Sequence, residues 1–193
     1  MFKRIMMVFA ALCLSAGIAC AEGKKNPVVE MDTSLGKIKI ELFEKEAPIS
    51  VKNFLDYVNS GFFADTIFHR IIPGFMIQGG GLNSKLSPKA GEKPPIKNEA
   101  GNGLKNIRGT LSMARSGDPN SAAAQFFINV NNNSFLDHRD DSTAGYGYAV
   151  FGKVIEGMDV VDKIVTTPQE RKNSVFQNVP KVPVIITSVK VLK

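Results

Sequence analysis

Arg70 stands among bulky apolar residues, an unusual setting for a charged side chain. The run from Phe68 to Gly80 reads FHRIIPGFMIQGG, so isoleucines, a phenylalanine and a methionine follow the arginine. A guanidinium keeps its charge at any accessible pH and presents a rigid fork of N–H donors. An arginine beside Phe75 and Met76 therefore indicates a docking site for an apolar group that carries an exposed carbonyl.

Other catalytic groups are sparse. His69 and His138 are the only histidines, and with no cysteine nearby they do not indicate a zinc site. No nucleophile elbow marks a Ser-His-Asp hydrolase, the spacing of 137–141 does not match a calcium loop, and 79–81 lacks the Gly-Lys-Ser/Thr ending of a phosphate loop. We therefore expect no metal and no cofactor. We interpret the three glycines at 79–81 as a flexible exit from a strand and His69 as a packed, hydrogen-bonded strand residue.

The first 21 residues have the pattern of an export signal. Lys3 and Arg4 precede an apolar run from Ile5 to Leu14, and Ala19-Cys20-Ala21 is typical of a signal peptidase site. We predict cleavage after Ala21, a mature domain over residues 22–193 and a periplasmic location.

Both cysteines, Cys13 and Cys20, lie in that leader, so the mature chain would contain no thiol and no disulfide. A lipoprotein cleaved before Cys20 is the minor alternative. It is disfavoured because Gly17 stands where lipid-attachment sites usually have a large aliphatic residue.

The composition describes one globular domain. The chain has 193 residues, of which 44% are hydrophobic and 22% charged. Removing Lys3 and Arg4 with the leader lowers the net charge from +6 to +4, and the basic residues are scattered rather than clustered. No later segment approaches about 20 continuous apolar residues. We expect a monomer that binds no nucleic acid and has no membrane span.

Hydrophobic periodicity predicts many short strands and two isolated helices. Alternating residues at 28–33 and 37–42 flank a turn with glycine, which is typical of a hairpin. An amphipathic helix begins at Pro48 and stops at Gly61. The remaining elements are expected at 66–72, 75–78, 109–114, 125–130, 148–154 and 182–192 for strands and at 156–165 for a helix.

This order of elements favours an all-β barrel or sandwich over a parallel βαβ fold. Pairing of the first and last strands in one sheet would remove exposed edges. The polar segment 79–106 is too long for a simple turn, and we expect it to be an ordered excursion beside a binding groove.

Several segments beyond the run around Arg70 carry a family pattern. They are GTLSMAR at 109–115, 121–129 with QFFI, FLD at 135–137 and YAVFGKV at 148–154. With them, nearly all of residues 22–193 resembles the cyclophilin-type peptidyl-prolyl cis-trans isomerases. The resemblance implies a closed eight-stranded antiparallel β-barrel capped by two α-helices, with a groove for proline-containing polypeptides on its outer face. It also implies isomerisation of X-Pro bonds in unfolded or flexible chains, and thus assistance to protein folding, without a cofactor.

Position by position, the resemblance implies that Arg70 is the catalytic residue. It places Phe75, Met76, Phe127 and Leu136 in the walls of the proline pocket. The other groove positions that it implies are Gln78, Ala114, Arg115, Gln125, Phe135 and Tyr148. Phe135 stands where many eukaryotic members have tryptophan, so we expect weak binding of cyclosporin.

Without the resemblance, Arg70 would more often be an exposed charge over apolar surface, and the phenylalanines would be ordinary core. The competing function is a peptide-binding chaperone with little reliance on catalysis. Retention of Arg70 favours the enzyme, because peptide binding alone would tolerate loss of the guanidinium; Phe75, Gln78 and Phe127 are retained with it. The loop 138–147 is longer than in compact members of the family, and we expect it to flank the groove and tune substrate choice.

Overall fold

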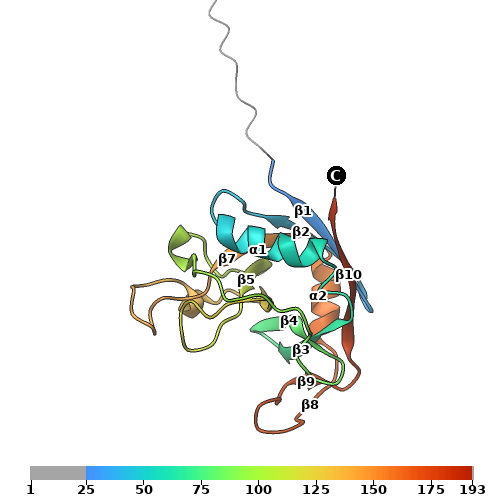
Figure 1. Ribbon diagram of the computed structural model, residues 1–193. Helices are drawn as coiled ribbons and strands as arrows, with labels where there is room; N and C mark the ends of the chain where they lie inside the picture. The colour runs from blue at the N-terminus through green and yellow to red at the C-terminus, as the bar shows by residue number, and fades with distance from the viewer. Residues whose placement is uncertain (1–24, 193) are drawn as a thin grey trace, which may run out of the picture.

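Short strands and two helices form the frame of the structure, for which the computed structural model describes residues 25–192 (Figure 1). The strands are β1 (Val28–Thr33), β2 (Gly36–Leu42), β3 (Thr66–Ile72), β4 (Met76–Asn83), β5 (Thr110–Met113), β6 (Phe126–Asn129), β7 (Val150–Glu156), β8 (Gln169–Glu170), β9 (Val179–Pro180) and β10 (Val184–Leu192). The helices are α1 (Pro48–Asn59) and α2 (Met158–Val165), with short 3-10 turns at Ala100–Asn102 and Ser134–Leu136. The predicted leader and its cleavage site lie outside the described residues.

Eight strands close into an antiparallel barrel in the order β1-β10-β3-β4-β6-β5-β7-β2. The first and last strands pair, with Val28 opposite Leu192, so the two ends of the described chain lie side by side (Figure 1). Closure leaves no unpaired barrel edge. The predicted fold class is confirmed.

The barrel is filled from the helices as well as from the strands. In α1, Phe54 is buried, and its ring lies against those of Phe63, Phe126 and Phe151 at centroid distances of 4.9 to 5.6 Å. Glu99 accepts hydrogen bonds from the first backbone N–H groups of this helix, which neutralises its amino-terminal dipole. No helix among the described residues has the length and apolar character needed to cross a membrane.

The three glycines after Gln78 are a correction to the sequence prediction. They are buried in β4, which continues to Asn83, so the polar excursion begins only after that residue. Gly80 has a φ of +85°, and a Cβ there would lie 2.5 Å from the ring of Phe126. The glycines therefore permit close packing and are not a flexible exit from the strand.

Candidate active site

A β-bulge in β3 directs Arg70 to the outer face of the barrel. Phe68 and Arg70 are opposite Gly79 and Gln78, which are consecutive in β4, so His69 is the extra residue. Phe68 points into the core, whereas Arg70 is exposed. Bulges commonly re-aim a side chain next to an active site.

The amide of Gln78, which is itself bonded to the amide of Gln125, orients the guanidinium. Arg70 Nη1 donates to Gln78 Oε1 at 3.3 Å, and Gln78 Nε2 donates to Gln125 Oε1 at 3.0 Å. Within residues 25–192, no carboxylate forms an ion pair with Arg70. Its charge is therefore oriented without being neutralised.

Next to Arg70 lies a small apolar pocket separate from the barrel core. Strand alternation explains it: in β6, Phe126 and Ile128 point inward, which leaves Phe127 on the outer face. Phe127 packs with Met76 and Leu136 around a cavity of about 90 Å³. Because drug-sized ligands need roughly 300 Å³ or more, this cavity suits one small side chain or ring.

Arg115, a second arginine at the pocket, has its donors occupied. Its Nε donates to the carbonyl of Gly147 at 3.0 Å, its Nη1 donates to that of Ser116 at 2.9 Å, and its guanidinium stacks on Tyr148 at 4.7 Å from the ring centroid. Tyr148 in turn meets Phe127 edge to face. Arg115 therefore builds the pocket wall, whereas Arg70 keeps donors for a ligand.

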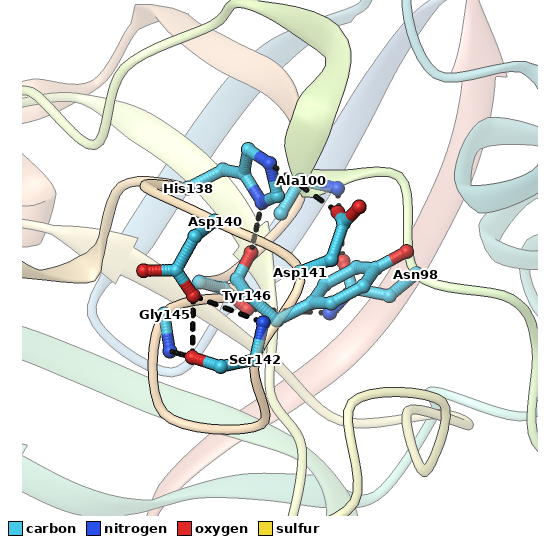
Figure 2. Close-up of polar contacts among 9 residues, drawn as sticks. Asn98, Ala100, His138, Asp140, Asp141, Ser142, Gly145 and Tyr146 are labelled. Carbon is cyan, nitrogen blue, oxygen red and sulfur yellow. Dashed lines mark hydrogen bonds and ion pairs between the residues drawn. The ribbon is translucent and has the colours of Figure 1, made fainter.

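The loop 138–147 contacts this wall and is ordered by its own hydrogen bonds. His138 Nδ1 lies 2.9 Å from the carbonyl oxygen of Tyr146, and Ser142 donates from its backbone to Asp140 (Figure 2). Hydrogen bonds from Ser142 lower the pKa of Asp140 below its usual value. Because Gly147 at the end of the loop holds Arg115, the loop borders the groove, while its effect on substrate choice stays a prediction.

Buried asparagines tie the separate pocket segments together. Asn133 Nδ2 donates to the carbonyl of Phe75 at 2.9 Å, and Asn106 Nδ2 donates to Asp137 at 3.1 Å and to the carbonyl of Tyr148 at 3.4 Å. Sequence reasoning missed these residues, because asparagine-rich segments are read as turns.

The structure brings together most of the residues implied by the family resemblance. All of them line the 90 Å³ cavity except Gln125 and Phe135. Gln125 does not line the cavity, but it accepts a hydrogen bond from Gln78, which does. Phe135 is 66% exposed outside the cavity, with its ring 5.4 Å from that of Phe75.

The family model described as "Cyclophilin type peptidyl-prolyl cis-trans isomerase/CLD" matches residues 28–191. The chain belongs to this family. Peptidyl-prolyl cis-trans isomerase A of Dickeya dadantii is 51% identical over 194 residues, with 100% of each chain covered. Isomerase B of Escherichia coli is 56% identical over 164 residues, which cover 85% of this chain and 99% of the relative. The predicted family and enzyme class are thus confirmed.

Solved structures agree with this assignment. A cyclophilin-type isomerase of Cryptosporidium parvum superposes with a TM-score of 0.71 at 30% identity, covering 87% of this chain and 98% of the other. A second structure of that protein, obtained in the presence of the dipeptide Ala-Pro, gives the same TM-score and identity, with 86% and 99% coverage.

The prediction that His69 of this cyclophilin is a packed, hydrogen-bonded strand residue is confirmed only in part. The side chain is packed, with 6% of its surface exposed, but Nδ1 has no hydrogen-bond partner. Burial lowers its pKa to about 4; the charge of Arg70 acts in the same direction, and a backbone hydrogen bond with Ile67 opposes it.

A second cavity, of about 590 Å³, adjoins Arg70 on the side of His69. Its outer wall is Val175–Asn178, at the tip of the hairpin formed by β8 and β9. Sequence reasoning missed this hairpin; Asn173, a typical turn residue, was the available signal. Among residues 25–192, no group of three or more His, Cys, Asp or Glu could hold a metal ion.

Proposed function

We propose that this cyclophilin accelerates rotation about X-Pro bonds in unfolded or flexible polypeptides, with Arg70 as its catalytic residue. The observation that carries the proposal is a guanidinium that bonds the neutral amide of Gln78 at an apolar pocket with room for one small ring. The solved relative obtained with Ala-Pro supports proline-containing polypeptides as the ligands.

Rotation about the X-Pro bond is slow because it breaks amide resonance, with a barrier of about 18–20 kcal/mol. In the twisted transition state the prolyl nitrogen becomes pyramidal and regains its lone pair. An N–H of Arg70 directed at that nitrogen stabilises the twisted state more than either planar isomer, which is the condition for catalysis. No covalent intermediate is needed.

The pocket holds the proline while the rest of the peptide rotates. Burial of the pyrrolidine ring against Met76, Phe127 and Leu136 supplies about 1.5–3 kcal/mol of binding free energy. Gln78 orients Arg70 through its carbonyl oxygen and has one amide N–H left for a substrate carbonyl.

The test is isomerisation of a short Xaa-Pro peptide by NMR exchange, which needs no coupling protease. We expect Arg70→Ala to lower kcat/KM about 100-fold, as removal of one transition-state donor does in other enzymes. Arg108→Ala is the matched control, since Arg108 is exposed, lies outside the 138–147 loop and does not line the pocket. Wild-type turnover in Arg70→Ala would refute the assignment.

The same variant tests the chaperone alternative. If the wild-type protein binds peptide but exchanges it no faster than the uncatalysed rate, the groove serves binding alone. If Arg70→Ala binds peptide and loses turnover, catalysis is the function of this side chain.

We further propose that residues 1–21 direct export and that the mature enzyme assists folding in the periplasm as a monomer. The support is the leader pattern around Lys3, Arg4 and Ala19-Cys20-Ala21. Cell fractionation and mass spectrometry of the protein expressed in a Gram-negative host should give a periplasmic chain that begins at Glu22. A lipidated chain that begins at Cys20 would instead establish the lipoprotein alternative.

Weak binding of cyclosporin is also proposed. Phe135 offers an exposed ring at the rim of the pocket but no indole N–H donor. Inhibition titrations of the NMR exchange would measure the affinity.

A further inference from the structure

The tip of the hairpin between β8 and β9 is ordered by its own hydrogen bonds. Asn173 Oδ1 accepts from the backbone N–H groups of Val175 and Phe176, both at 2.9 Å, and Lys172 N donates to the carbonyl of Phe176 at 2.8 Å. Despite this order, Val175 is 78% exposed. A fixed backbone therefore presents an uncovered apolar side chain.

The hairpin is fastened next to Arg70. The carbonyl of Asn178 accepts a hydrogen bond from the N–H of Ile71 at 2.9 Å, and β9 packs against β3 (Figure 1). Ile71 follows Arg70 in sequence, so one backbone hydrogen bond connects the hairpin to the residue after the catalytic arginine. The position of the tip relative to the active site is thereby fixed.

Between the tip and β3 lies the cavity of about 590 Å³. Arg70 and Gln78 line both this cavity and the proline pocket, so the two spaces adjoin. A peptide with its proline in the pocket therefore extends into the larger cavity. Leu82, Val175 and Phe176 give it apolar surface.

The charges around this cavity have one sign. Arg70 and Arg115 line it and no described carboxylate does. A cationic side chain would be repelled there and an apolar one would find surface to cover.

We propose that Val175–Asn178 is a specificity-determining wall of the substrate groove, which takes a large apolar side chain flanking the X-Pro dipeptide of an extended polypeptide. The inference rests on the proposed function, because the same peptide must place its proline in the pocket beside Arg70. The hairpin thus selects among X-Pro sites that the pocket alone would treat alike.

The experiment is a positional scan of alanine-based peptides with one Ala-Pro bond. Leu or Lys is placed in turn at each of the three positions on either side, and kcat/KM is measured by NMR exchange. For the wild-type enzyme we expect Leu at one position to raise kcat/KM about three- to tenfold over Ala, the usual effect of a partly buried apolar group, and Lys there to lower it.

Substitution of Val175 links this preference to the hairpin. In Val175→Ser the Leu-to-Ala ratio at that position should fall close to one, and Val175→Glu should favour Lys over Leu there. Val182→Ser and Val182→Glu are matched controls, since Val182 is also 78% exposed but does not line the cavity. Both controls should keep the wild-type ratios.

The outcomes separate the two proposals. A flat scan for the wild-type enzyme, or an unchanged Leu preference in Val175→Ser, overturns the hairpin inference while turnover of the all-alanine peptide still supports the proposed function. Wild-type turnover of the all-alanine peptide by Arg70→Ala counts against the proposed function instead.

Discussion

At the scale of single residues, the two arginines of the pocket have different roles. Arg70 is held by an amide and keeps free donors, whereas Arg115 is bound to backbone carbonyls and stacked on Tyr148. We predict that Arg115→Ala lowers kcat/KM only about two- to fivefold, the size of a lost cation–π contact. NMR exchange measures both variants, and a loss in Arg115→Ala equal to that in Arg70→Ala would contradict the division of roles.

His69 makes the stability of the fold depend on pH. Its pKa is about 4 in the folded state and 6.5 in the unfolded chain, so between these values the unfolded state binds more protons. The free energy of unfolding should therefore fall as the pH drops below 6.5, by about 2 kcal/mol between pH 7 and pH 5 from this residue. Urea titrations at the two pH values measure the change.

The control is His69→Gln, which removes the buried imidazole and keeps His138. Its unfolding free energy should change with pH by about 2 kcal/mol less than that of the wild-type protein over the same range. Equal pH dependence in the two proteins would show that His69 is not the group responsible.

At the scale of elements, the packing of β4 depends on having no side chain at its central positions. Gly80 combines a positive φ with a Cβ position 2.5 Å from Phe126. We predict that Gly80→Ala lowers the unfolding free energy by about 2–4 kcal/mol, from backbone strain and overpacking together. Gly117→Ala should change it by less than about 0.5 kcal/mol, because nothing lies within 4 Å of its Cβ position. Equal unfolding curves for the two variants would contradict this.

Elements with clear periodicity could be predicted from the sequence, and those without it could not. The expected strand at 66–72 matches β3 residue for residue, and the expected helix from Pro48 matches α1. The hairpin of β8 and β9 was missed because strands of two residues have no periodicity, and its position depends on the Asn178–Ile71 hydrogen bond. The bulge at His69 was missed for a related reason: it is a shift in pairing, which a single strand does not reveal.

At the scale of the whole molecule, the site exists because barrel closure gathers segments that are far apart in sequence. Arg70, Arg115 and Tyr148 come from β3 and from the chain after β5 and before β7, and meet at one cavity. The family resemblance could assign the pocket residues because their spacing is distinctive. It did not assign the second cavity, whose wall at 175–178 lies outside the segments that carry the resemblance.

Because β1 and β10 pair in the barrel, the chain can be circularly permuted. Val28 pairs with Leu192, so a short Gly/Ser linker from residue 192 to residue 25 can join the ends. New termini between Lys181 and Val182, both exposed, would then place β10 directly before β1 as a local hairpin. We predict that this circular permutant keeps its isomerase activity, because every barrel strand retains its partners.

The permutant should also fold several times faster than the natural chain order. Its longest-range strand pairing becomes local, and loop closure is the main entropic cost of such pairings. Stopped-flow refolding measures the rate, and NMR exchange measures activity. A permutant opened between Leu111 and Ser112 is the control, because the break interrupts β5 between β6 and β7 and should prevent folding. If the first permutant refolded no faster than the natural order, closure of the barrel by β1 and β10 would not be the step that limits folding.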